Sequence, residues 1–215
     1  MATNDVPARR TQAERRGESE EALLDAAAKL IAERGVERAS LASIGERAGT
    51  SRGLPTHHFG SKDALVARLA SRVQDHVAAA SLNALEQRLH RKPDEVSALD
   101  VLRTTLDTYL ELFEDPSSEE RALIVMWGAT FPSGASIEGM LEADRRSYDG
   151  WAELIRHGQR DGSIRSDIDP AATAVVLFGL MRGVAALLLT ESHIKDMRRV
   201  RATCDGWIVA ALAAP

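Results

Sequence analysis

The sequence is poor in cysteine and lacks the signals of an exported protein. Among 215 residues there is one cysteine, Cys204, so a disulfide framework within the chain is excluded, and a reducing compartment, the cytoplasm, is expected. Arginines near the N-terminus are followed by no apolar stretch, so we expect no secretory signal. With 44% apolar and 27% charged residues, the composition is that of a soluble globular protein.

Long uninterrupted hydrophobic runs are also lacking. Residues 171–190 are strongly apolar, but Thr173, Arg182 and two glycines interrupt them before they reach the length that a bilayer requires. We therefore expect a buried helix here and no membrane partner.

Positive charge is scarce in the chain as a whole, which carries a net charge of −5 with a pI near 5.7. Residues 1–62 contain 10 Lys and Arg against 9 Asp and Glu, whereas residues 63–215 contain 17 against 23. Local placement can still create a phosphate-binding surface. The basic residues that could face phosphates are Arg9, Arg10, Arg15, Arg16, Arg52 and Lys62. The alternative is that these charges only solvate a surface.

The stretch from Ser40 to Ala48 predicts one short helix followed by a tight turn. Apolar residues recur at helical spacing, and Ser40 can cap the helix by accepting a backbone hydrogen bond. Gly45 lets a second helix cross closely, and Gly49 tolerates a left-handed turn. A new helix must begin near Ser51. Two short helices joined in this way form a helix-turn-helix, whose second helix lies in the DNA major groove.

The flanks make this pattern more specific. An amphipathic helix is predicted from about Glu18 to Arg34, with Gly35 placed to end it. After the turn, Phe59 can anchor the exit and Ser61 can cap the next helix. Together the blocks LLDAAAKLIAERG, IGERAG and HHFGSKDAL resemble the N-terminal domain of TetR-family transcriptional regulators, over about residues 20–69.

The recognition segment departs from the family pattern. Where the family usually has a leucine or similar residue and then a tyrosine, this chain has Pro55 and Thr56. Because proline is tolerated best in the first turn of a helix, we predict that the recognition helix starts late, near Leu54, or has a distorted first turn.

Candidate DNA contacts follow from position and chemistry. Arg52 can pair with guanine or with a phosphate, Gly53 allows close backbone approach, and the resemblance implies that Lys62 contacts the DNA backbone. The full set of predicted DNA-binding residues is Ser40, Ser51, Arg52, Gly53, Thr56, His57, His58 and Lys62. For the two histidines, the alternative is that one packs under the head and the other is merely exposed. A metal role is not expected because no second ligand pair stands nearby.

The rest of the chain predicts a helical bundle without repeats or strands. The expected helices cover Ala64 to about His90, Glu95–Phe113, a shorter segment with Leu123 to Thr130, Ile137–Gln159, Ala171–Thr190 and about Lys195–Ala214. Breaks are expected at Pro93, at residues 115–117 and at residues 131–134. Asp169 should cap the fifth of these helices, with Pro170 at its first position.

The last two helices predict a dimer interface. The first of them is apolar nearly all round and must be covered on both sides. The resemblance implies that the pair forms a four-helix interface about a two-fold axis, for which we nominate Gly179, Gly183, Trp207 and Ile208. The alternative is that both helices are consumed by their own core, in which case Arg182 needs a buried partner such as Glu191.

The middle helices predict a small-molecule cavity. The family is controlled by effectors that enter the C-terminal bundle, and aromatic residues make up only 4% of this chain. Four of them, Tyr109, Trp127, Tyr148 and Trp151, lie on inward faces and are the predicted lining, with simple core filling as the alternative.

The sequence thus predicts an all-α protein with a three-helix head and a larger C-terminal bundle that dimerises. The predicted domains are a flexible arginine-containing arm (1–16), a helix-turn-helix DNA-binding domain (17–62), and a helical ligand-binding and dimerisation domain (63–215). The resemblance implies a repressor released from a palindromic operator on double-stranded DNA by a small-molecule effector, with no cofactor.

Two alternatives come from other classes. One is a ligand sensor or structural dimer module that has lost DNA binding through Pro55. The other is a helical-bundle enzyme, for which neither a Glu-x-x-His pair nor a glycine-rich phosphate loop is present.

Overall fold

The computed structural model describes residues 11–89, 96–130, 138–190 and 196–215, and most of these are helical. In chain order the helices are α1 (Gln12–Arg34), α2 (Leu41–Arg47), α3 (Leu54–Phe59), α4 (Lys62–Leu89), α5 (Ala98–Leu112), α6 (Ser118–Gly128), α8 (Glu138–Asp161), α9 (Pro170–Thr190) and α10 (Met197–Leu212). Within the described ranges, β-type pairing is limited to an isolated bridge between Ile164 and Ala213. The all-α prediction is confirmed.

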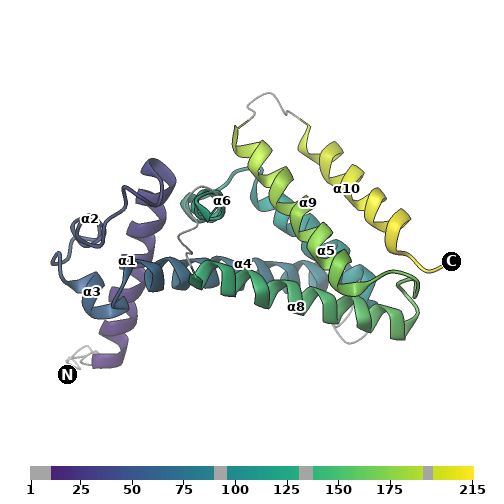
Figure 1. Ribbon diagram of the computed structural model, residues 1–215, viewed down its shortest axis with the longest axis horizontal. Coiled ribbons are helices and arrows are strands. Elements are labelled where there is room, and N and C mark those ends of the chain that lie inside the picture. Colours follow the sequence, from purple (N-terminus) through teal and green to yellow (C-terminus); the bar gives the residue numbers. More distant parts are fainter. Residues whose placement is uncertain (1–10, 90–95, 131–137, 191–195) are drawn as a thin grey trace, which may run out of the picture.

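The helices form a head and a bundle at opposite ends of an elongated molecule. Figure 1 shows α1, α2 and α3 at one end, α5, α9 and α10 at the other, and the long helix α4 running between them. Helix α8 packs along α4, and α6 lies against α1. The head therefore touches the bundle through two elements, α4 and α6.

Helix α1 starts earlier than predicted. Its N-terminus is a capping box in which the Thr11 hydroxyl accepts from the Glu14 N–H (3.2 Å) and the Glu14 carboxylate accepts from the Thr11 N–H (2.7 Å). The prediction that residues up to 16 belong to a flexible arm is therefore wrong for residues 12–16. Residues 1–10 lie outside the described part of the chain.

The helix-turn-helix is built as predicted. The Ser40 hydroxyl accepts from the Ser43 N–H (3.1 Å) and caps α2. A β-carbon added to Gly45 would lie 2.6 Å from the Ser51 carbonyl oxygen, so the absence of a side chain lets the turn approach α2. Gly49 has a φ of 70°, which confirms the left-handed turn.

Helix α3 begins at Leu54, as the position of Pro55 predicts. Pro55 occupies the first turn, where its missing N–H would have no partner within the helix, and it is buried. At the exit, Ser61 accepts from the Ala64 N–H (3.1 Å), which confirms it as the cap of α4.

A continuous apolar core supports the head. Apolar residues of α1 are fully buried against the start of α4 and the α2 region, and the main contributors are Leu23, Leu24, Ile31, Val36, Ile44, Leu65 and Leu69. The wide apolar stripe predicted for the first helix therefore packs against α2 and the start of α4, and α3 packs in turn against α2 and α4.

The predicted breaks are confirmed where the structure describes them. Helix α5 ends at Leu112 and α6 begins at Ser118, around the predicted break at 115–117, and the Asp169 carboxylate caps α9 by accepting from the Ala172 N–H (2.7 Å). The breaks predicted at Pro93 and at 131–134 lie outside the described residues.

Helix α9 is, among the described helices, the one long and apolar enough to cross a membrane by length and composition. One face is buried in the bundle and carries Arg182, whose side chain is 2% exposed and pairs with Asp144 of α8 (2.6 Å). The other face is open: Val175, Val176 and Leu187 are 56%, 69% and 54% exposed. The described residues of one chain thus cover α9 on one side only.

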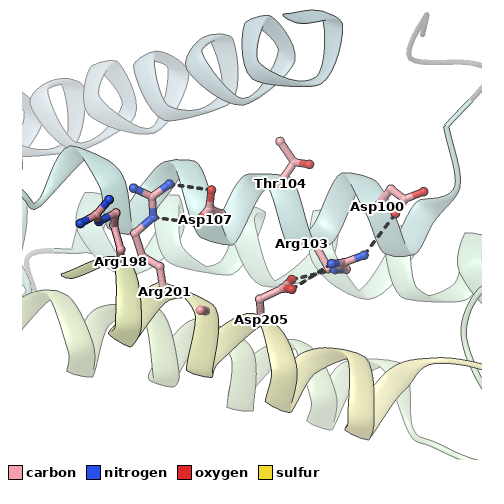
Figure 2. A pocket seen from close by; sticks show the side chains of 8 residues that line it. Asp100, Arg103, Thr104, Asp107, Arg198, Arg201 and Asp205 are labelled. Atoms are coloured by element: carbon pink, nitrogen blue, oxygen red, sulfur yellow. Dashed lines mark hydrogen bonds and ion pairs between the residues drawn. The ribbon is translucent and has the colours of Figure 1, made fainter. Parts of the chain in front are cut away.

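Helix α10 is attached to α5 by a row of ion pairs. Figure 2 shows Arg201 paired with Asp107 through two bonds (2.6 and 2.7 Å) and Arg103 paired with Asp205 through two more (2.7 and 2.8 Å). Arg201 also reaches Glu114 (2.8 Å). These half-buried bidentate pairs fix α10 in place, so the surface that α9 and α10 share has a defined shape.

Candidate DNA interface and effector cavity

The exposed face of α3 carries three of the predicted DNA contacts. Arg52 precedes the helix and its side chain is 76% exposed, and Thr56 and His57 are also exposed. His58 is half-buried, with its ring 6.1 Å from that of Phe59. The prediction that Thr56 and His57 point outward is confirmed, while His58 turns partly toward the head.

Arg52 is held by an ion pair on the same surface. Its guanidinium pairs with the Glu46 carboxylate of α2, and the Glu46 side chain is 50% exposed. An exposed pair of this kind contributes little to stability, so Arg52 can exchange Glu46 for a base or a phosphate at small cost.

Of the other predicted contacts, Ser40 and Lys62 lie at helix starts and Ser51 lies in the turn before α3. Ser40 and Ser51 are exposed, although the Ser40 hydroxyl is already engaged in capping α2. Lys62 stands at the start of α4, and its ammonium donates to the Glu37 carbonyl (3.3 Å). A surface lysine on a flexible stem can move from that carbonyl to a phosphate.

Gly53 has no structural reason to be glycine within the head. Its φ of −87° is open to any residue, and an added β-carbon would meet nothing within 4 Å among the described residues. Gly45 is the opposite case, because the fold itself fills the space beside it.

A groove of about 530 Å³ beside α3 was missed from the sequence. It is lined by Gln12, Arg15, Arg16, Ser19, Leu54, His57 and His58. Because the first turns of α1 were assigned to a flexible arm, their arginines could not be placed next to the recognition helix. The Thr11–Glu14 capping box was the signal that could have found them.

A cavity of about 330 Å³, open to solvent at exposed residues such as Asp75 and Arg146, lies among the helices of the C-terminal bundle. It is lined by Gln74, Asp75, Val77, Ala78, Thr105, Tyr109, Leu123, Arg146, Ser147, Gly150, Trp151, Phe178, Met181 and Arg182. Two of the four predicted lining residues, Tyr109 and Trp151, belong to this wall. Trp127 and Tyr148 do not, so the prediction is wrong for them.

Trp127 and Tyr148 stand behind the cavity wall instead. The Tyr148 ring meets that of Phe178 edge to face at 4.6 Å, and the Arg182 guanidinium lies 4.7 Å from the Phe178 ring centre and 5.6 Å from that of Trp127. These rings shape the wall and hold Arg182 by cation–π contact.

Two polar groups, Tyr109 in the cavity wall and Asp144 beside Arg182, are desolvated by burial. Burial raises the pKa of Tyr109 well above its usual value, and burial also raises the pKa of Asp144, although the neighbouring Arg182 acts in the opposite direction. Among the described residues Arg182 pairs with Asp144, whereas Glu191, which the sequence offered as a partner, lies outside them. Arg182 and Asp144 lie 38 residues apart in the sequence, so no local sequence pattern predicts their pairing.

The predicted dimer residues divide into exposed and buried ones. Trp207 is 65% exposed, Gly179 is exposed, and Gly183 is half-buried with open space where a β-carbon would be. Ile208 is only 2% exposed, so the prediction that it lies in the interface is wrong. It faces the core of its own chain because it follows Trp207 by one residue, about 100° around the helix.

Comparison with known proteins agrees with this geometry. The sequence model described as "Bacterial regulatory proteins, tetR family" matches residues 23–69. The chain is 35% identical over 166 residues to the HTH-type transcriptional regulator YvdT of Bacillus subtilis, covering 77% of this chain and 79% of YvdT. It is 25% identical over 193 residues to UidR of Escherichia coli K12, covering 88% and 92% of the two chains. A crystal structure of a TetR-family regulator from a Rhodococcus species has the same fold, with a TM-score of 0.77, 22% identity and coverage of 92% and 100%.

Proposed function

Since the chain belongs to the tetR family of bacterial regulatory proteins and is a helix-turn-helix transcriptional regulator, we propose that it represses transcription from a palindromic operator. It acts in the cytoplasm as a homodimer and leaves the operator when a small molecule enters the cavity of the bundle.

The observation that carries the DNA-binding part is the exposed surface around α3. Arg52, Thr56 and His57 are exposed on the head, and the groove that His57 lines brings in Arg15 and Arg16 from α1. Side chains with donors for base edges thus adjoin side chains suited to phosphates.

The dimer follows from the open face of α9 and α10. Of the five large apolar side chains most exposed in the described chain, four belong to these two helices: Val175, Val176, Leu187 and Trp207. An apolar surface of this kind indicates an interaction site, and a two-fold axis pairs the same surface with itself. Two heads joined in this way match a palindrome when they lie about 34 Å apart.

Release by an effector requires that the cavity communicate with the head. Leu123 of α6 lines the cavity, and Glu119 at the start of the same helix pairs with Arg72 of α4 (2.7 Å). Arg72 also pairs with Glu21 and Asp25 of α1. A ligand that favours a different position of α6 would therefore favour a different position of the head, which is the condition for coupling.

Two substitutions test the roles assigned at the DNA interface. Binding of the full-length dimer to a palindromic duplex from its own upstream region is compared with binding to a scrambled duplex by fluorescence anisotropy. Arg52→Ala should lower the preference for the operator about tenfold, because a bidentate arginine–guanine pair discriminates by about 1–3 kcal/mol. Lys62→Ala should weaken both duplexes equally. Full discrimination by the Arg52→Ala protein would remove Arg52 from the base-reading residues.

A further inference from the structure

The effector cavity contains buried polar atoms that the chain leaves without partners. Among the described residues, Nη1 of Arg182, the hydroxyl of Tyr109 and Nε2 of Gln74 make no hydrogen bond, and all three residues line the cavity. Arg182 and Tyr109 are 2% and 4% exposed. A buried polar atom without a partner is costly, so three around one cavity indicate what its occupant must supply.

The chemistry of these atoms is that of donors. Arginine can only donate, and the Tyr109 hydroxyl is protonated at any physiological pH because burial raises its pKa. The Gln74 amide can turn either its N–H or its carbonyl toward a ligand. A matching head group must therefore accept at least two hydrogen bonds.

The rest of the wall combines apolar side chains with the polar and charged side chains of Asp75, Thr105, Arg146 and Ser147. Trp151 and Phe178 meet at 83° with ring centres 6.3 Å apart, and Val77, Leu123 and Met181 complete the apolar part. At about 330 Å³ the cavity is at the small end of the usual range for ligand sites, which is roughly 300–1,000 Å³. It suits a body of one or two rings, or a short acyl chain.

A larger cavity lies between α5 and α10, and none of its lining residues is among the described ones with buried polar atoms that lack a partner. It measures about 460 Å³, but the arginines and carboxylates that Figure 2 shows facing each other across it, Arg201 with Asp107 and Arg103 with Asp205, are already paired.

We propose that the effector is a small apolar carboxylate whose two oxygens accept from Arg182 Nη1 and the Tyr109 hydroxyl. The proposal rests on the proposed function of the cavity as the effector site. Asp144 binds Arg182 through Nη2 and leaves Nη1 available, so the guanidinium can bridge the two acids. Charge-assisted bonds of this kind are about twice as strong as neutral ones, which favours an acid over its amide.

A cationic effector is the opposite possibility, and the aromatic wall argues against it. The ring faces that would hold a quaternary ammonium group, those of Phe178 and Trp127, already hold the Arg182 guanidinium. A second cation would be repelled by Arg182 and by Arg146, which also lines the cavity. The carboxylate of Asp144 is already paired, so the exposed Asp75 is the one carboxylate that the described lining offers to a cation.

The test is isothermal titration of the full-length dimer, without DNA, with benzoate, cinnamate and hexanoate, their three amides, and choline. At least one acid should bind, and its amide should bind about tenfold more weakly. Failure of all three acids to bind at low-millimolar concentration would overturn the proposal, and so would an amide or choline that binds as tightly as the acids.

Two hydroxyl deletions on the cavity wall locate the acid. Tyr109→Phe removes a hydroxyl without a partner and should weaken acid binding about tenfold, while leaving the protein at least as stable to heat. Thr105→Val is the matched control, because the Thr105 hydroxyl already donates to the Val101 carbonyl (2.9 Å) and should not matter for the acid. Equal acid affinity of the Tyr109→Phe protein and the wild type would overturn the assignment.

Arg182 is tested as a pair, because removing it alone would leave Asp144 buried and uncompensated. The double change Arg182→Gln with Asp144→Asn removes both charges together, and the preference for acid over amide should disappear. A preserved preference would contradict the role of Arg182.

Operator release is measured separately by anisotropy. Acid binding without loss of operator affinity would leave the carboxylate site standing and overturn effector control. Release by choline but not by any acid would leave effector control standing and overturn the carboxylate site.

Discussion

Gly45 and Gly53 differ in what surrounds them. We therefore expect a substitution at Gly45 to change the stability of the fold and one at Gly53 to change DNA binding. A β-carbon at Gly45 would collide with the turn, whereas one at Gly53 would meet nothing in the described chain. The need for glycine at Gly45 comes from the fold. The described chain sets no such requirement at Gly53, where we expect the missing side chain to allow close approach of a duplex to the backbone.

The paired substitutions Gly45→Ala and Gly53→Ala should therefore have opposite signatures. Gly45→Ala should lower the free energy of unfolding by about 1–3 kcal/mol through overpacking. Gly53→Ala should keep or slightly raise stability but weaken operator binding about tenfold, which corresponds to about 1.4 kcal/mol. Urea unfolding and operator titration of both proteins check this. Unchanged operator affinity in the Gly53→Ala protein would show that the duplex does not approach this backbone.

Residues with a local signature could be predicted from the sequence. The cap at Ser40, the turn at Gly49 and the delayed helix start imposed by Pro55 each follow from the neighbours of one residue, and each is confirmed. The Arg182–Asp144 pair and the exact wall of the cavity depend on how α8 packs on α9. Spacing along one helix carries no information on that packing, which is why Trp127 and Tyr148 were misplaced and Ile208 was assigned to the wrong side.

At the level of elements, α6 and α4 connect the cavity to the head. Arg72 of α4 is 14% exposed and joins carboxylates from α1 and α6, so it couples three helices at once. Arg68 of the same helix pairs with Glu20 of α1 (2.8 Å), and its side chain is 46% exposed. Both arginines pair with carboxylates of α1, and Arg72 pairs with a carboxylate of α6 as well.

Arg72→Met should weaken the coupling between effector and operator. The apolar stem keeps its packing, whereas the link from α6 to α1 is lost. We expect the factor by which a saturating effector lowers operator affinity to fall at least about fivefold, within the range of typical coupling energies. Arg68→Met is the control and should leave that factor unchanged. An Arg72→Met protein with wild-type coupling would show that the signal reaches the head by another route.

Element boundaries were predictable where caps are strong. Ser61, Asp169 and the break before α6 set helix limits that agree with the structure. The start of α1 was missed because its first turn is polar and carries no apolar period, and the capping box alone defines it.

At the level of the whole molecule, the open face of α9 and α10 is the surface that we propose for dimerisation. The sequence predicted that α9 must be covered on both sides, and the chain itself covers one. We propose that the second side belongs to another copy of the chain.

Val176→Glu should convert the protein to a monomer, because it places a charge in the middle of this face, where Val176 is 69% exposed. The control is Leu82→Glu on α4, where the leucine is 49% exposed but belongs to neither α9 nor α10. Sedimentation at micromolar concentration should give half the wild-type mass for Val176→Glu and the wild-type mass for Leu82→Glu. A dimeric Val176→Glu protein would move the interface elsewhere.

The most direct test of the account is a titration of the palindromic upstream duplex with the wild-type protein and with the Val176→Glu variant over a range of salt concentrations. We predict two wild-type chains per duplex, an affinity that falls as salt rises, and much weaker binding by the variant. A wild-type protein that binds this duplex no better than a scrambled one at low ionic strength, or a monomer that binds as tightly as the dimer, would contradict it.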